Sequence, residues 1–308
     1  MQMKNNKIAK LIGITQNTAL SFCRGIFLLG IIYIIITPIL SIILDSFKDI
    51  TDMFNPLVFM IPSEFTLANY RLALNNMDYF ASLSASLTLS LGAMILQLLV
   101  CSMTGYGFAR FKFYGREFLF GLVIISIVVP TQSYLIPLFT QFFDFRFLGL
   151  RMNVLNTYIP VFLMSAFGMG LRSGLFIYLF RQFFRGVPKE IEEAARIDGA
   201  GWFRTYAQVM LPNAAPALLT VCVFSFVWQI NDTFFASMFM QRLNLLPVRL
   251  LTLASYLGGS NILTVEEIVR IPLIVNAGIM LSVAPAIILY FSVQRFFLEG
   301  IERSGIVG

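Results

Sequence analysis

The sequence has few ionisable side chains. Its 308 residues include no histidine, and only 12% are charged, against about 25% in ordinary soluble domains. Without histidine the chain has no imidazole for proton transfer, and without a Gly-x-x-x-x-Gly-Lys motif it has no P-loop for ATP. A water-soluble globule, an imidazole-based catalyst and an internal ATP site are therefore excluded, so any energy source must come from elsewhere.

Cysteine is also scarce. Cys23, Cys101 and Cys222 lie in or beside apolar runs. They form no metal-ligand spacing and no disulfide framework, so they are predicted to be packed free thiols.

Long apolar runs dominate what remains, because 58% of the residues are hydrophobic. A membrane-spanning helix needs roughly 20 apolar residues, and its backbone must be hydrogen-bonded within the segment. The sequence therefore predicts an all-α integral membrane protein, with residues 1–308 forming a single transmembrane domain. Six transmembrane helices are expected at about residues 25–44, 83–108, 118–139, 155–180, 215–238 and 271–291. The first run is too long for a secretory signal core and lacks a cleavage site, which favours an uncleaved anchor.

The distribution of cations predicts the orientation. Basic residues are concentrated before the first run, between the second and third, and between the fourth and fifth, whereas acidic residues prevail after the first run. By the positive-inside rule both termini and the loop after the fourth run are cytoplasmic. The net charge of +6 therefore reflects topology and does not indicate nucleic-acid binding. The apolar residues of the segment from Asp45 to about Phe80 suggest that it lies against the membrane surface or a partner.

The loop after the fourth run, residues 188–212, has a helical pattern with a break. Pro188 suits a first helical turn, and the acidic residues that follow favour the positive end of the helix dipole. Gly199 can adopt a positive φ and end this helix, after which a second short helix runs towards Leu211 and Pro212. Two short helices meeting at a bare backbone corner would fit a cleft in a partner. An amphipathic hairpin lying on the lipid surface is the alternative.

The ordered motif in this loop resembles the Glu-Ala-Ala loop of permease subunits of ATP-binding-cassette (ABC) importers. The residues that carry the resemblance are Glu193, Ala194, Ala195, Asp198, Gly199, Ala200, Leu211 and Pro212. Residues 61–70, 107–113 and 294–300 are similar to the carbohydrate branch of that family, of which the maltose-type inner-membrane permeases are members. Trp228, Asn231 and Asp232 are similar to the Trp-Asn-Asp of its fifth span, although Gln229 and Ile230 separate the tryptophan from the pair.

The resemblance implies a transport subunit that is not itself an enzyme. It implies a heterodimer with a second permease subunit, two cytoplasmic ATPase subunits bound at the Glu-Ala-Ala loop, and an extracytoplasmic solute-binding protein that delivers a sugar. It implies no cofactor in this chain, because ATP and magnesium would bind the partner ATPase, and a mechanism of alternating access. The localisation implied is the cell membrane of a prokaryote.

Polar residues within the runs are the candidates for the translocation pathway, because burying them in lipid is costly. Asp232 lies well inside the fifth run with Trp228 on the same helical stripe, and Asn231 lies about 100° round from it. Arg172 lies inside the fourth run. Tryptophan faces and amides suit sugars. The alternative for each residue is a packing role, including an arginine that anchors its helix to carbonyls.

Other function classes stay open at this point. An ion-coupled secondary carrier would need a coupling site, for which Asp232 is the one carboxylate deep in a run. A membrane scaffold would explain the spans but not the loop motif. An ABC permease for a polar solute other than a sugar is the nearest alternative within the family.

The predicted orientation is testable by cysteine labelling. In a variant that lacks the native thiols, single cysteines at Asp52 and Asn261 should react with a membrane-impermeant maleimide in intact cells. Cysteines at Lys112 and Lys189 should react only after permeabilisation, because the positive-inside rule places their loops in the cytoplasm. Labelling of position 189 from outside would overturn the orientation.

Overall fold

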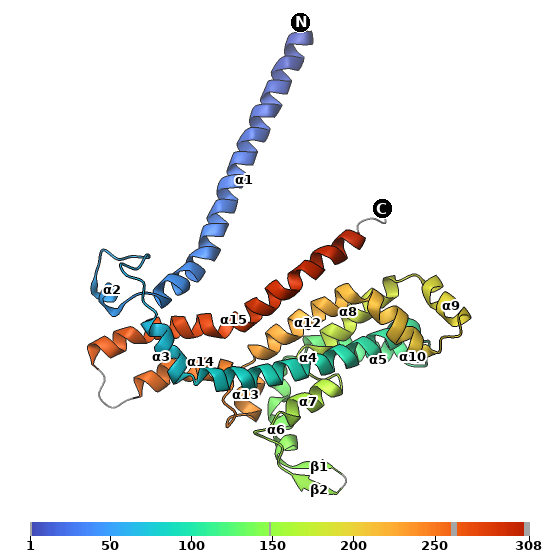
Figure 1. Ribbon diagram of the computed structural model, residues 1–308. Coiled ribbons are helices and arrows are strands. Elements are labelled where there is room, and N and C mark those ends of the chain that lie inside the picture. The colour runs from blue at the N-terminus through green and yellow to red at the C-terminus, as the bar shows by residue number, and fades with distance from the viewer. Residues whose placement is uncertain (1, 148, 260–263, 305–308) are drawn as a thin grey trace. The chain divides into compact units, whose positions relative to one another are not determined.

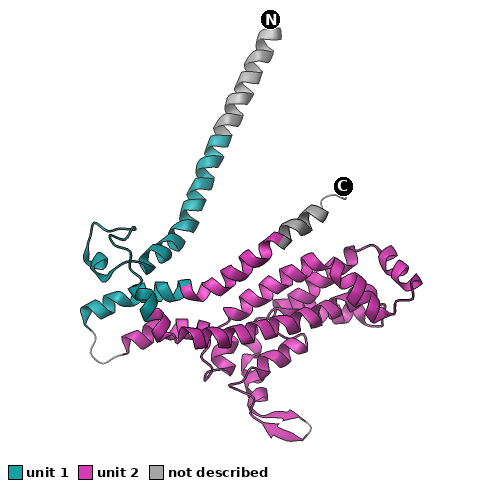
Figure 2. Ribbon diagram, in the orientation of Figure 1, with its two compact units in different colours: residues 1–72, 262–280 teal, residues 73–261, 281–308 magenta. Residues whose placement is uncertain are grey.

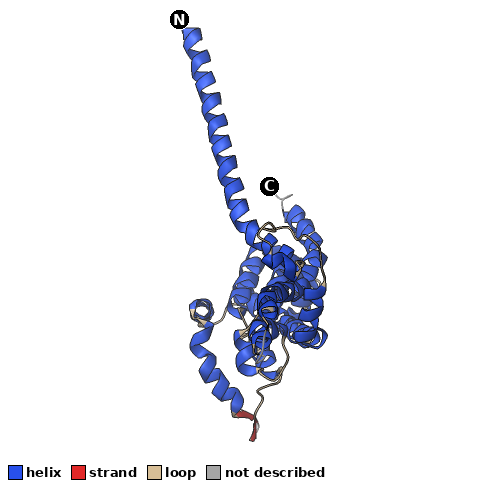
Figure 3. Ribbon diagram, turned by 90° about the vertical axis from the view of Figure 1, so that its left-hand side faces the viewer, coloured by secondary structure: helices blue, strands red, loops and turns tan. Residues whose placement is uncertain are grey.

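The computed structural model describes residues 2–147, 149–259 and 264–304 (Figure 1). Helices make up most of this part of the chain, and its strands form one hairpin, β1 (Phe145–Phe147) and β2 (Leu150–Met152) (Figure 3). The strands are antiparallel, with Arg146 opposite Arg151. A hydrogen bond from Arg146 lowers the pKa of Asp144, at the entrance to the hairpin. The predominance of helices in the described residues agrees with the all-α prediction, and the hairpin is the departure from it.

The chain divides into two compact units, residues 1–72 with 262–280 and residues 73–261 with 281–308 (Figure 2). Unit 1 contains α1 (Gln2–Ser46), α2 (Ile50–Phe54), the start of α3 (Ala68–Asn76) and the start of α15 (Val265–Ser304). Its centre is the buried Asn69. The Asn69 side-chain amide donates to the carbonyl oxygens of Ser46 at 3.2 Å and Lys48 at 2.8 Å, and its oxygen accepts from Arg270 Nε at 3.3 Å.

Two positions chosen for labelling from sequence need revision. Asp52 is buried and accepts hydrogen bonds from the backbone and side chain of Ser63, while Asn261 lies outside the described residues. The exposed Glu64 is the better external position, and Lys112 and Lys189 are exposed as the labelling requires.

Unit 2 is organised around one long helix, α4. In chain order its elements are α4 (Tyr79–Arg110), α5 (Arg116–Val128), η1 (Thr131–Tyr134), α6 (Leu135–Phe143), the hairpin, α7 (Ile159–Ala166), α8 (Ser173–Gly186), α9 (Lys189–Ile197), α10 (Trp202–Thr205), η2 (Tyr206–Met210), α11 (Leu211–Asn213), α12 (Ala215–Ile230), α13 (Phe234–Phe239) and α14 (Leu246–Gly258). Helices α7, α8, α12 and α14 all pack against α4. In unit 2, one continuous helix is therefore packed against several shorter ones.

Three of the six apolar runs differ from the expected continuous helices. The run at 118–139 bends by 103° between α5 and η1, because Pro130 has no backbone N–H to continue a helix. The run at 155–180 is split into α7 and α8, and Gly168 has a φ of +71° between them. The run at 215–238 is split into α12 and α13 at Asn231 and Asp232.

Within the described residues, three helices are long and apolar enough to cross a membrane, or up to five if each of two bent pairs counts as one span. The continuous three are Ser21–Ser46, Tyr79–Arg110 and Val265–Arg295. They contain the first, second and sixth expected helices. The architecture of multiple apolar spans is confirmed, while the count of six stays a prediction.

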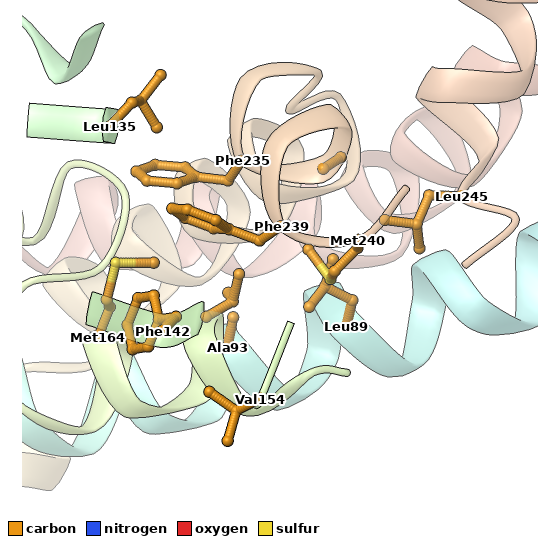
Figure 4. Close-up of a cluster of buried hydrophobic side chains, with 12 residues drawn as sticks. Leu89, Ala93, Leu135, Phe142, Val154, Met164, Phe235, Phe239, Met240 and Leu245 are labelled. Carbon is orange, nitrogen blue, oxygen red and sulfur yellow. The ribbon is translucent and has the colours of Figure 1, made fainter. Parts of the chain in front are cut away.

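Two apolar clusters hold unit 2 together. The first joins α4, α6, α7 and α13, where the rings of Phe235 and Phe239 lie 5.5 Å apart and Phe142 contacts Phe239 edge-on (Figure 4). The second joins the other half of α4 to α8, η2 and α12 through buried phenylalanines of α8 and through Tyr206 and Met210. The second cluster underlies the loop that carries the Glu-Ala-Ala motif.

Candidate functional site

Helix α9 presents one face to the protein and one to solvent. It begins directly after Pro188, as the sequence predicts. Glu192 and Ala195 face inward and are buried, whereas Glu193, Ala194 and Asp198 are exposed. The small side chain of Ala194 therefore lies on an open surface that another protein can approach closely.

The helix ends in a Schellman motif, as expected from the glycine. Gly199 has a φ of +80°. Its N–H donates to the carbonyl of Arg196 and the N–H of Ala200 donates to that of Ala195, both at 3.0 Å. A Cβ added at Gly199 would meet nothing within 4 Å, so the backbone conformation and not crowding demands the glycine.

A buried ion pair anchors α9 to the end of α4. Arg110 Nε lies 3.2 Å from Glu192 Oε1, and both side chains are almost fully buried. A second nitrogen of Arg110 donates to the carbonyl oxygen of Val187 at 2.6 Å. Glu192 also pairs with Arg196 at 3.6 Å, and the guanidinium of Arg196 lies 3.9 Å from the centre of the Trp202 ring. This network fixes the angle between α9 and α10.

The return segment, α10 to α11, connects this corner to the membrane helices. Tyr206 lies in the π-helical turn η2, its hydroxyl 2.7 Å from Ser102 Oγ of α4. Its ring lies 5.2 Å from that of Tyr106. Leu211 is half-buried against the second apolar cluster, and Pro212 is exposed. The structure thus brings the residues of the motif onto one rigid element resting on α4.

The sequence reasoning missed residues on both sides of this element. On its surface, Ile197, Trp202 and Phe203 are 86%, 54% and 71% exposed, so the corner is more apolar than the motif indicates. Beneath it, the ion pair of Arg110 and Glu192 gave no sequence signal, because the partners are far apart along the chain. The one available clue was Arg110 at the end of an apolar run.

Of the four pathway candidates, the structure brings Arg172 and Trp228 together. The Arg172 guanidinium lies 5.6 Å from the centre of the Trp228 ring, and that ring stacks on Phe176 and Phe224. Arg172 has a φ of +61° in the break before α8. It lines a cavity of about 480 Å³ between the broken third and fourth runs, together with Thr131, Gln141 and mainly apolar residues.

Asn231 and Asp232 hold the ends of the two helices they separate. Asn231 donates to the carbonyl oxygen of Val227 at 2.8 Å, at the end of α12. Asp232 is buried and accepts from the backbone N–H groups of Phe235 at 3.0 Å and Ala236 at 3.3 Å. Its carboxylate therefore caps α13 and does not join the Arg172 and Trp228 pair.

A glutamine that the sequence analysis did not single out lies at the centre of unit 2. Gln97 of α4 donates to the carbonyl oxygen of Leu171 at 2.9 Å and to Ser173 Oγ at 3.1 Å, and its oxygen accepts from Ser225 of α12. The break between α7 and α8, where Arg172 lies, is thus fastened to two neighbouring helices.

This chain is similar in sequence to a known family and to several transport proteins. Residues 101–303 match the family model described as "Binding-protein-dependent transport system inner membrane component". The chain is 29% identical over 293 residues to the arabinooligosaccharides transport system permease protein AraQ of Halalkalibacterium halodurans, covering 90% of this chain and 93% of that protein. It is 31% identical over 252 residues to the alpha-glucoside transport system permease protein AglG of Rhizobium meliloti, covering 80% of this chain but 62% of that protein.

The fold also resembles a solved structure. A chain of a bacterial ABC transporter involved in the import of the acidic polysaccharide alginate superposes with a TM-score of 0.75, at 20% sequence identity. The match covers 92% of this chain and 98% of that one. At this identity the likeness establishes the shared fold.

The adjacent glutamates of α9 provide a matched test of the anchor. Glu192→Ala should leave Arg110 buried without its partner, which costs about 3–5 kcal/mol for a buried ion pair. Glu193→Ala removes an exposed side chain and should change little. The difference should appear in the melting temperature of the detergent-purified protein and in faster amide hydrogen exchange of residues 187–198. Equal melting temperatures for the two variants would show that the ion pair does not hold the loop.

Proposed function

This chain belongs to the family of inner membrane components of binding-protein-dependent transport systems, and from that membership we propose that it forms one half of a sugar-import pathway. Three sequence-based predictions are confirmed by the membership: the chain is a permease subunit of an ABC importer, its role is transport and not catalysis, and it is a multi-pass protein of the inner membrane. A permease of this class works with a second permease, an ATPase and a binding protein.

The finer features of the assembly are part of the proposal. Residues 1–308 form a single transmembrane domain that crosses the membrane six times, with the third to fifth crossings broken. The partner permease is a different chain, and two ATPase subunits bind ATP and magnesium on the cytoplasmic side, where both termini of this chain lie. Support comes from the cation-rich loops and from the motif residues gathered on one element.

Sugar is the proposed substrate class. The names of AraQ and AglG refer to arabinooligosaccharides and alpha-glucosides. Arg172, which lines the cavity, suits such a substrate because a guanidinium donates to hydroxyls. Trp228 lies against Arg172, and we place its ring in the same pathway because an aromatic face covers the apolar face of a sugar ring. Specific recognition would be shared with the binding protein and the second permease.

The observation that carries the proposed coupling is the anchored corner at Gly199. Glu193, Ala194, Asp198 and Gly199 form its exposed surface, and Ala195, Ala200 and Leu211 support it from within or at its edge. We place the ATPase contact on this surface, together with the exposed Ile197, Trp202 and Phe203. Small and apolar side chains at a fixed corner allow a close fit in a cleft.

The same geometry explains how ATPase movement would reach the pathway. The corner is joined to α4 by the Arg110 and Glu192 ion pair and by the hydroxyl contact of Tyr206 with Ser102. Further along α4, Gln97 holds the break beside Arg172. Closure of the ATPases around ATP would pull the corner, and the rigid α4 would carry that displacement to the cavity, opening it alternately to the two sides.

The docking assignment predicts the behaviour of Gly199→Asp. The added side chain enters open space, and aspartate is among the residues that tolerate the positive φ of Gly199. The chain should therefore still insert and fold, but the charge should hold the ATPase away. Recovery of the ATPase in pull-down should fall at least about tenfold, equivalent to roughly 1.4 kcal/mol, and uptake should be lost. Gly115→Asp adds the same charge at another glycine of positive φ, +78°, where a Cβ also meets nothing, and is the matched control. Normal uptake by Gly199→Asp would remove the docking site.

The pathway assignment predicts one outcome for Arg172 and Trp228, which lie together, and another for Asp232, which caps a helix. Trp228→Ala and Arg172→Asn, the latter a residue that tolerates positive φ, should lower uptake per assembled complex several-fold. Asp232→Leu should instead lower the amount of complex and the uptake in parallel, because losing a helix cap costs about 1 kcal/mol. Asp232→Asn, which retains a capping oxygen, should assemble normally. Unchanged uptake per complex in Trp228→Ala would exclude the tryptophan from the pathway.

A further inference from the structure

Unit 1 carries an exposed apolar loop directly after its membrane-spanning helix. We call residues 53–61 the apolar loop. Leu57 is 90% exposed, Phe59 93% and Ile61 69%, and Met53 and Phe54 are also exposed. Neighbouring apolar side chains of this size are rarely exposed to water together on the surface of a soluble protein.

The loop has a defined structure. Lys48 Nζ donates to the carbonyl oxygen of Phe59 at 3.1 Å, and the side chain of Asn55 accepts from the N–H of Leu57 at 3.1 Å. At the end of the loop, Asp52 accepts from the backbone and side chain of Ser63. Just beyond it, the N–H of Thr66 donates to the carbonyl oxygen of Phe47 at 2.8 Å. These bonds return the loop to the end of α1, so its apolar side chains are presented beside that helix.

Charge is arranged so that the apolar loop remains neutral. Residues 53–63 include no charged side chain. On the amino-terminal side of the loop the charges are turned inward or paired, since Asp52 and Lys48 are buried and Lys48 pairs with Asp45 at 2.7 Å. On the other side the first charge is the exposed Glu64. The outward surface of the loop is therefore apolar, and its polar bonds lie at its base.

We propose that the apolar loop inserts into the interfacial layer of the lipid bilayer beside the end of α1. The span Ser21–Ser46 ends seven residues before the loop begins, and the loop returns to that end, so the apolar surface continues the lipid-facing surface of the helix. Amphipathic elements of monotopic proteins bury aromatic and aliphatic side chains in this layer. The loop thus fixes the depth of α1 in the membrane.

Continuity with α1 favours lipid over a protein partner as the occupant. A solute-binding protein that delivers its ligand and leaves would expose the loop to water after every cycle. The bilayer, in contrast, is always present at the end of a spanning helix. A loop without charge also lacks the polar rim that protein interfaces use for specificity.

The test is a depth measurement on the full-length chain in vesicles of phosphatidylethanolamine and phosphatidylglycerol. Native cysteines are replaced by alanine, and nitroxide labels are attached at Leu57→Cys, Phe59→Cys and, as the control, Glu64→Cys. Collisions with oxygen and with a water-soluble nickel complex should place labels 57 and 59 roughly 5–10 Å below the phosphates. Label 64, at an exposed charged position of the same segment, should stay accessible to nickel.

A second readout covers the possibility that the cysteine-free chain does not fold. In a chain that keeps its cysteines but has Trp202 and Trp228 replaced by phenylalanine, Phe59→Trp fluorescence should be quenched by brominated lipid acyl chains, and Glu64→Trp fluorescence should not. Nickel access at positions 57 and 59 equal to that at 64, or quenching that is equal for the two tryptophans, would overturn the proposal. Protection from nickel that appears only after a solute-binding protein is added would also overturn it.

Discussion

The absence of water from the bilayer core is the constraint on which the structure depends. A peptide group that leaves a helix in lipid has no solvent to bond to, yet this chain breaks its helices at three places inside apolar runs. At two of these places, and at the start of α14, side chains bond backbone groups that the helices leave free. Gln97 binds the carbonyl of Leu171, Asp232 caps α13, and Ser86 accepts from the N–H of Leu246 at the start of α14.

Two of these three side chains, Gln97 and Ser86, belong to α4. Because α4 is long and unbroken, it can bond irregular elements that lie far apart along its length. Ser86 and Gln97 lie on its buried side, and Ser102 on the same helix meets Tyr206 of the return segment. A single continuous helix is therefore bonded to several of the irregular elements. Movement of the corner at Gly199 relative to the breaks requires α4 to move, because the same helix is bonded to both.

Local signals in the sequence were enough to predict part of this arrangement. Pro188 and Gly199 determine the start and end of α9 through their own backbone preferences, and the predicted positive φ at Gly199 is confirmed. Pro130 breaks the third run through the same kind of local effect, although a continuous helix was expected there. Such effects depend on one residue and its neighbours, so they can be recognised without knowledge of the fold.

Other features depend on contacts between distant segments and could not be predicted. A carboxylate deep in an apolar run suggests a pathway, but whether Asp232 faces a cavity or turns back to cap a helix depends on the backbone after it. Likewise, Glu192 and Glu193 are chemically identical in the sequence, and only the position of Arg110 distinguishes the buried one. The stripe drawn through Trp228 and Asp232 assumed a continuous helix, which ends at Ile230.

The unequal lengths of the helices have a consequence for the surrounding lipid. At 1.5 Å per residue, the 16 residues of α12 extend about 24 Å, less than the roughly 30 Å of a hydrocarbon core. The 32 residues of α4 extend about 48 Å on the same scale. A helix longer than the hydrocarbon core can accommodate the mismatch by tilting. A helix shorter than the core cannot, because tilting shortens its reach across the bilayer further. Acyl-chain length therefore acts on this subunit chiefly through the tilt of its long continuous helices, of which α4 is one.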